Sequence, residues 1–194
     1  SIAPEQLQND LDNPNRRVGK GDKFGYNYDI YALQAEAWIQ NVINLPHWDI
    51  NYGLKMSYTQ YQRDGHMRNG RAPGNSLGKS AMQRFDNAGV KVGATYKLDG
   101  RNYFTAHLDY GTRAPLFDNV YIAPRVKNTT VVNPANERDF SADLSYTWNY
   151  RRFRGSITGY YTEMDNAIER NGFYDESYQT YANYILTDVK RVYK

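Results

Sequence analysis

One stretch of the sequence, residues 47–61, alternates regularly between apolar and polar or small side chains. Since successive side chains of a β-strand point to opposite faces of a sheet, this period of two predicts a strand with one apolar and one polar face. Aromatic residues at both ends of an aliphatic stretch are typical of strands that cross a bilayer, because Trp and Tyr favour the headgroup levels. The apolar positions are Trp48, Ile50, Tyr52, Leu54, Met56 and Tyr58.

Six further stretches show the same alternation and are predicted to be strands. They are residues 31–40, 87–97, 103–113, 139–150, 153–162 and 180–194. The polar positions between their apolar residues carry charges of both signs, and burying these in a packed core would be costly unless every charge were paired. One face is therefore expected to contact water, and the other to contact lipid or a second sheet. The most regular of these strands, residues 139–150, places Phe140, Leu144, Tyr146 and Trp148 on its apolar face.

The connections between these stretches are expected to alternate between short turns and long loops. The short turns are residues 44–46, 98–101 and 150–152, and the long loops are residues 63–84, 112–136 and 163–179. Outer-membrane barrels have short periplasmic turns and long extracellular loops. The sequence therefore predicts an all-β fold, an antiparallel meander of about seven strands over residues 24–194, which forms a segment of a large transmembrane β-barrel with a wet interior. Residues 1–23 are polar without a sustained period and are expected to form an extracellular-type loop.

The composition argues against several other classes of protein. No stretch approaches the roughly 18 consecutive apolar residues of a transmembrane helix. The chain has no Cys, so it has neither disulfides nor thiolate metal ligands, and its net charge of +3 demands no nucleic-acid partner. No catalytic set is recognisable from spacing, and the three His residues lack metal-ligand spacing. We therefore expect neither an enzyme nor a bound metal or cofactor.

Two of the expected long loops carry opposite charges. Residues 63–84 are basic, which suits either an anionic ligand, such as the phosphates of surface lipopolysaccharide, or simple solvation. Residues 163–176 are acidic, so the two loops could also complement each other. The cations of the basic loop are Arg63, Arg68, Arg71, Lys79 and Arg84.

The segment Tyr110-Gly111-Thr112-Arg113-Ala114-Pro115, followed by Asn133-Pro134-Ala135-Asn136-Glu137, resembles TonB-dependent outer-membrane receptors. In that family, a barrel strand that ends in an aromatic, Arg, Ala, Pro signature leads into an extracellular loop, and an Asn-Pro box with a nearby Glu opens the returning strand. The resemblance covers residues 24–194, and the style of the loops suggests a Bacteroidetes-like member. Thr112 replaces the usual aromatic, and residues 116–132 lack the His of haem receptors, so haem uptake is not supported.

The resemblance implies a barrel of about 22 strands around a plug domain. The chain would then be a fragment of about a third of one barrel. The chain begins with Ser1 and has no signal sequence, so we expect either a removed secretory signal or a piece of a longer protein. The implied function is the import of a scarce nutrient complex, such as a siderophore, a glycan or a cobalamin-like ligand, across the bacterial outer membrane. The implied partners are outer-membrane lipid or lipopolysaccharide, the remaining barrel, the plug, and through it the energy-coupling TonB complex.

The candidate functional residues follow from the loops and from the two faces. The expected long loops and the lumen would carry ligand contacts, with Arg113 as a positioning residue near the extracellular rim. A soluble all-β ligand- or carbohydrate-binding module remains an alternative, in which the apolar faces would pack against another sheet. An autotransporter-like or porin barrel would share the faces but lack the two boxes. The ligand-binding candidates are Arg113, His66, Arg68, Arg71, Asn133 and Glu137, and the membrane-facing candidates are Trp48, Ile50, Tyr52, Leu54, Tyr58, Phe140, Leu144, Tyr146 and Trp148.

Overall fold

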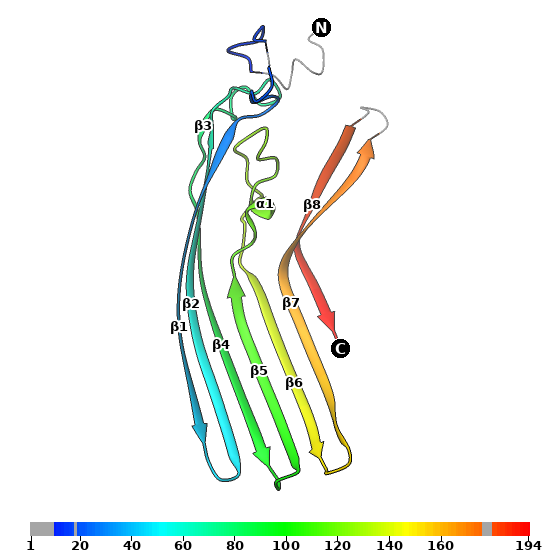
Figure 1. The fold of residues 1–194 in the computed structure, drawn as a ribbon. Coiled ribbons are helices and arrows are strands. Elements are labelled where there is room, and N and C mark those ends of the chain that lie inside the picture. Colours follow the sequence, from blue (N-terminus) through cyan, green and yellow to red (C-terminus); the bar gives the residue numbers. More distant parts are fainter. Residues whose placement is uncertain (1–9, 18, 176–179) are drawn as a thin grey trace. The chain divides into compact units, whose positions relative to one another are not determined.

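A computed structural model describes residues 10–17, 19–175 and 180–194 of the chain. Within these residues, seven long strands and one two-residue strand form a single sheet in the order β1-β2-β4-β5-β6-β7-β8, and β3 pairs with β2 (Figure 1). The predicted all-β antiparallel meander is therefore confirmed. The elements are β1 (Tyr28–Asn44), β2 (Trp48–Gly65), β3 (Gly78–Lys79), β4 (Gln83–Lys97), β5 (Asn102–Arg113), α1 (Phe117–Val120), β6 (Glu137–Asn149), β7 (Arg154–Asp175) and β8 (Thr180–Tyr193).

The three predicted tight turns connect β1 to β2, β4 to β5 and β6 to β7, at one end of the strands (Figure 1). The predicted strands except the last are longer than their apolar alternation alone indicated; β1, for example, begins three residues before Tyr31 and ends at Asn44. Among the described residues, no helix has the length and apolarity required to cross a membrane.

The chain divides into two compact units. The first, here called the loop unit, comprises Ser1–Gln34, Thr59–Arg84 and Leu116–Pro134, and the second, the strand unit, comprises Ala35–Tyr58, Phe85–Pro115 and Ala135–Lys194. One part of β1 and one part of β2 belong to each unit. The two units are described separately below.

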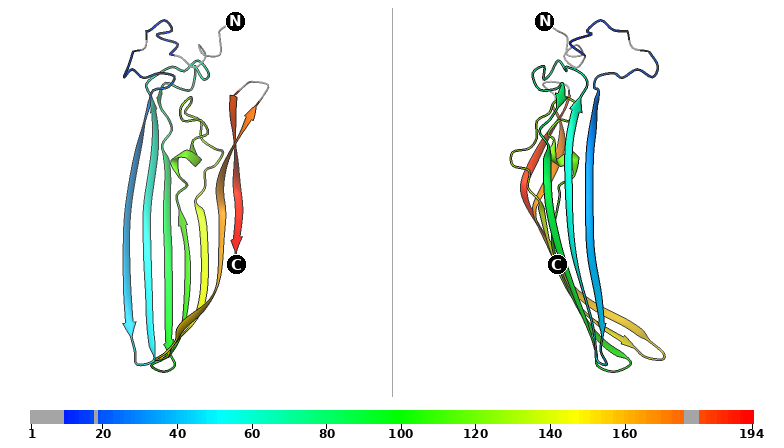
Figure 2. Two further views of the ribbon diagram at one scale, coloured as in Figure 1. Left: turned by 45° about the vertical axis from the view of Figure 1, so that its right-hand side comes forward. Right: turned by 90° about the vertical axis from the view of Figure 1, so that its left-hand side faces the viewer.

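In the strand unit, the sheet is a single layer (Figure 2). The side chains on its two faces differ in chemistry. On one face, Phe104 lies opposite Tyr146 and Tyr110 lies opposite Phe140, so aromatic side chains of neighbouring strands meet. On the other face, His107 lies opposite Asp143. The alternation read from the sequence is therefore kept across the strands, because cross-strand partners lie on the same face of a sheet.

The predicted acidic loop at residues 163–179 is wrong for most of its length. β7 continues to Asp175, and its residues from Glu169 onward pair with the beginning of β8. The ladder is interrupted between Met164 and Glu169, where Asn166 adopts a positive φ of 57°. This part of the hairpin lacks the apolar alternation by which the other strands were identified, so backbone pairing alone defines it. Residues 176–179 lie outside the described residues.

The loop unit contains a compact core that the expected long loops at 63–84 and 112–136 did not predict. Val120 and Tyr121 are fully buried, and Met67 and Val131 are each 5% exposed. Phe117 stacks on Tyr121 with 4.7 Å between ring centroids, and the hydroxyl of Tyr121 lies 2.7 Å from Ser80 Oγ. These segments connect strands, but they pack against one another as a small folded body.

Candidate functional site

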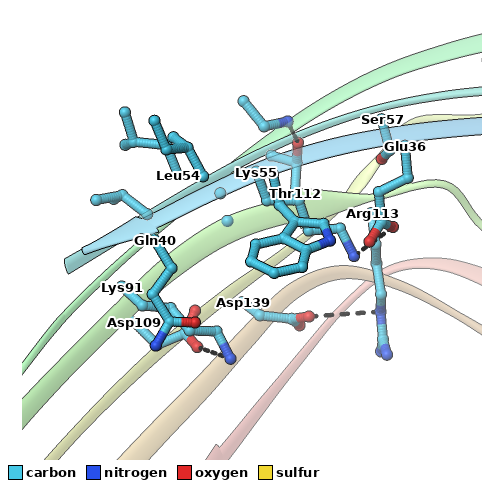
Figure 3. Close-up of a pocket in the computed structure, with 17 residues that line it drawn as sticks. Glu36, Gln40, Leu54, Lys55, Ser57, Lys91, Asp109, Thr112, Arg113 and Asp139 are labelled. Carbon is cyan, nitrogen blue, oxygen red and sulfur yellow. Dashed lines mark hydrogen bonds and ion pairs between the residues drawn. The ribbon is translucent and has the colours of Figure 1, made fainter. Parts of the chain in front are cut away.

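The strand unit has a hollow of about 430 Å³ on its polar face (Figure 3). Its floor contains one glycine from each of three strands, namely Gly53 of β2, Gly89 of β4 and Gly111 of β5. Since a glycine carries no side chain, three of them on neighbouring strands leave the backbone uncovered and create a depression in the sheet surface.

The backbone geometry explains why the floor is flat. Gly89 and Gly111 are direct cross-strand partners, and a Cβ added to Gly111 would lie only 3.1 Å from the Cα of Gly89. A Cβ added to Gly53 or Gly89 would meet nothing closer than 3.6 Å and 3.7 Å, which are ordinary contacts. A side chain at Gly111 would therefore require β4 and β5 to move slightly apart, whereas Gly53 and Gly89 keep the hollow open.

Ion pairs form the walls of the hollow. Glu36 Oε2 lies 2.6 Å from Lys55 Nζ, and Asp109 Oδ2 lies 2.9 Å from Lys91 Nζ. Figure 3 shows these pairs together with Arg113, whose Nε is 3.4 Å from Asp139 Oδ2. The lining therefore carries three carboxylates and three cations, and its formal charges cancel. An exposed ion pair contributes little to stability, so these pairs serve mainly to define the chemistry of the wall.

Three groups in or beside the hollow have unused binding capacity. The indole of Trp38, on β1, lines the hollow and is 71% exposed. Asp139 Oδ1 is shielded from solvent and accepts no hydrogen bond from the described residues. On the same face of β4, two residues before Gly89, the 7% exposed side chain of Asn87 has no partner there for its oxygen or its nitrogen. Unsatisfied buried polar groups are rare and therefore indicate a site that another molecule or segment completes.

The structure brings two of the predicted ligand-binding residues together. Arg113 and Glu137 are cross-strand partners in the β5–β6 ladder, and Arg113 Nε donates a 2.7 Å hydrogen bond to Glu137 Oε2. Glu137 is 8% exposed, whereas the Arg113 side chain is 57% exposed at the edge of the hollow. The two sequence boxes that contain these residues thus meet where β5 ends and β6 begins.

The other predicted ligand-binding residues belong to the loop unit. His66 Nε2 lies 2.8 Å from Asp29 Oδ2, and Arg68 is 2.6 Å from Asp12 Oδ1, so both have partners within the unit. Arg71 is exposed, and its backbone N–H donates to Asn69 Oδ1 at 2.9 Å. Asn133 is exposed and adopts a positive φ of 48°. No contact joins these four residues into one site.

Arg63 was grouped with the cations of a solvated or ligand-binding loop, and the structure corrects this assignment. Its side chain is 2% exposed and donates hydrogen bonds to the carbonyls of Pro124 at 2.5 Å and Ser76 at 3.0 Å. It also donates to Asn128 Oδ1 and lies over the ring of Tyr28. Burial lowers the pKa of the Arg63 guanidinium. Arg63 therefore holds the loop unit together instead of offering its charge to a ligand.

The predicted membrane-facing residues share the opposite face of the sheet in the strand unit. Trp48 contacts Tyr96 with 4.8 Å between ring centroids, and Phe104 stacks on Tyr146 at 4.9 Å. Leu54 and Leu144 are 52% and 61% exposed, and no second sheet covers them among the described residues. Ile50, Tyr58 and Trp148 are partly exposed, and Tyr52 and Phe140 are exposed.

No group of three or more potential metal ligands occurs within the part of the chain that the structure describes. The sequence reasoning did not nominate Trp38 or the three glycines of the hollow. The sequence contains a feature that could have identified each of them. An indole occupies a polar position of the first strand, and glycines occupy polar positions of three further strands. Their combined effect depends on strand register, which places residues from four strands side by side.

The comparisons with known proteins agree with this architecture. A family model described as TonB dependent receptor-like, beta-barrel matches residues 4–193. Neither the curated proteins nor the solved structures gave a match. The chain belongs to this receptor family, whose members are receptors and transporters of the bacterial outer membrane rather than enzymes.

Proposed function

We propose that the protein takes part in importing a scarce nutrient complex, such as a siderophore, a glycan or a cobalamin-like ligand, across the outer membrane. The observation that carries the proposal is the hollow on the polar face, which is lined by ion pairs and an exposed indole and lies opposite an exposed apolar face. A concave site with convergent polar groups is the usual location of a small-molecule ligand.

The apolar face supports a membrane protein over a soluble binding module. In a soluble sandwich, side chains such as Leu54, Leu144 and Ile157 would pack against a second sheet. These side chains are instead 52%, 61% and 68% exposed, and the described residues provide no covering layer. In this proposal the face contacts the hydrocarbon of the bilayer, residues 1–23 belong to the extracellular side, and residues 24–194 contribute to the barrel wall.

Contact with lipopolysaccharide is part of the proposal. Arg138 lies on the same face as Phe140, two residues along β6, and is 3.8 Å from Asp165. Lys190 lies 2.6 Å from Glu163, the cross-strand partner of Phe140. Both cations are paired with carboxylates, so in this proposal exposed cations of the basic loop, such as Arg71 and Arg84, meet the phosphates of lipid headgroups. The plug and the energy-coupling TonB complex are the further partners that the family implies.

A growth experiment tests the proposal. Cells that lack the gene are compared with complemented cells when the limiting nutrient is a ferric siderophore, a defined glycan or cobalamin. We expect the deletion to impair growth on one of these nutrient classes, and removal of the energy-coupling complex to have the same effect. Unchanged growth on all three classes would overturn the proposal.

A further inference from the structure

We propose that the hollow around Trp38 is a subsite for a neutral saccharide, which rests on the proposed import function and specifies its substrate class. The subsite consists of the Trp38 indole, the glycine floor, and the polar groups of Asp139, Arg113 and Lys55. Four observations carry the inference: the exposed indole, the paired charges, the flat floor and the unsatisfied carboxylate oxygen of Asp139.

The indole supplies a platform for a sugar ring. Trp38 is 71% exposed on a face that is otherwise polar, so its apolar surface is not used for packing within the described residues. The electron-rich face of an aromatic ring attracts the slightly positive C–H groups on one face of a pyranose, in the same way as it attracts the edge of another ring. Tryptophan is also enriched among residues that dominate binding energy.

The charge balance favours a neutral ligand. Glu36, Asp109 and Asp139 face Lys55, Lys91 and Arg113 across short distances. Arg113 also bonds to Glu137 beside the hollow, so the hollow presents no surplus of positive charge. An anionic iron complex would be recognised by unpaired cations, because charge-assisted bonds and long-range attraction both require a net positive site. A saccharide has many hydroxyl groups that both donate and accept, and it can bond to paired charges without displacing them.

The floor and the unsatisfied oxygen complete the match. The three glycines leave a flat area on which a planar ring can approach the backbone, and Asp139 Oδ1 is an acceptor without a donor among the described residues. A sugar hydroxyl can donate to this oxygen when the Asp139 carboxylate, whose side chain is 31% exposed, turns toward the hollow. This bond would satisfy a polar atom whose burial is otherwise costly.

The test is a binding measurement on the detergent-solubilised protein. The probes are maltohexaose, cellohexaose, laminarihexaose and xylohexaose as neutral oligosaccharides, with a ferric tris-catecholate complex and cobalamin as comparisons. We expect one neutral oligosaccharide to bind, and Trp38→Ala to raise its Kd about tenfold or more, since loss of a central aromatic contact typically has this cost. Trp38→Phe should retain most of the affinity, because it keeps an aromatic ring.

A matched pair of glycine variants separates occlusion of the hollow from misfolding. Gly89→Val fills the floor and should abolish oligosaccharide binding, while its nearest neighbours at 3.7 Å accept the added Cβ. Gly159→Val adds the same group to β7 on the opposite face, where nothing lies within 4 Å, and should bind normally. Circular dichroism, and the difference in SDS-gel mobility between heated and unheated samples, show whether each variant is folded.

The outcomes distinguish this inference from the import function. Binding of a neutral oligosaccharide that depends on Trp38 and Gly89 supports the inference. Binding of only the ferric complex or cobalamin, or oligosaccharide binding that neither variant affects, overturns it and leaves the import function intact. Absence of binding by every neutral oligosaccharide, as expected if another protein segment fills the hollow, also overturns the inference, and the growth experiment then decides separately on import.

Discussion

Arg63 illustrates, at the scale of a single residue, how a charged side chain can organise a loop region. Its guanidinium is buried and donates hydrogen bonds to two backbone carbonyls and to the side chain of Asn128, none of which is a carboxylate. The planar group has several donors in a fixed arrangement, so it can join segments that approach from different directions. The sequence gives Arg63 the same appearance as the exposed Arg68, and only the tertiary structure separates them.

Replacing Arg63 should loosen the loop unit. Arg63→Ala leaves buried acceptors without donors, and we expect a loss of about 2–4 kcal/mol in local stability. Arg63→Lys should have an intermediate effect, because an ammonium cannot reproduce the planar arrangement of donors. Trypsin cleavage after Arg68 and Arg71, followed by mass spectrometry, measures the change.

The cleavage rate should rise roughly 30-fold or more in Arg63→Ala, because each 1.4 kcal/mol is a factor of ten in the open population. Arg84→Ala is the control, since Arg84 is exposed and should not alter cleavage at the other sites. Resistance equal to that of the parent protein would show that Arg63 does not hold the unit together.

At the scale of elements, the β4–β5 turn is held by one carboxylate. Asp99 Oδ1 accepts hydrogen bonds from the backbone N–H groups of Arg101 and Asn102, both at 2.7 Å, and the side-chain amide of Asn102 donates to both oxygens. The Asn102 side-chain hydrogen bond, with the backbone bonds, lowers the pKa of Asp99 from its ordinary value of 3.8. An Asp that bonds to the backbone shortly after it is a common way to fix a turn.

The turn should therefore weaken in acid. Because the folded-state pKa of Asp99 is lower than the unfolded one, its contribution is present above about pH 3.8 and is lost as the pH falls through the folded-state pKa. Hydrogen exchange at the Arg101 and Asn102 amides, corrected for intrinsic rates, should show protection that declines as the pH falls below about 3.8. Asp99→Asn should exchange faster at neutral pH and show no such decline; a decline that persists in this variant would contradict the explanation.

The strands themselves were predictable to different degrees. The alternation at residues 47–61 and 139–150 identified β2 and β6, because one face of each strand is apolar throughout. The C-terminal part of β7 is predicted from the sequence to be an acidic loop, because the residues around Glu169 show no apolar alternation. Only their pairing with β8 makes this segment a strand. Apolar alternation identifies a strand only where the two faces of the strand differ in polarity.

At the scale of the whole molecule, a new charge should destabilise the protein on one face of the sheet and not on the other. Leu144 lies on the apolar face and is 61% exposed. If this face contacts hydrocarbon, Leu144→Arg should make folding into lipid vesicles less favourable by about 2–4 kcal/mol. His107→Arg is the matched control, because it places a cation on the polar face opposite Asp143, 3.0 Å from His107 in the parent protein.

The folded fraction in vesicles, measured by heat-modified migration on gels, checks this prediction. The control variant should fold as well as the parent protein. Equal folding of Leu144→Arg, or cooperative folding of the parent as a monomer in water without detergent, would show that the apolar face does not contact lipid.

The sequence by itself determined the strand alternation, the tight turns and the identity of the two faces, because side-chain direction in a strand follows from chain position alone. It also placed Trp48 and Trp148 on the apolar face. The tertiary structure decided what depends on register and on packing between distant segments. The glycine floor beside Trp38 needs residues from four strands to lie side by side, and the burial of Arg63 needs acceptors that lie 13 to 65 residues away in the sequence.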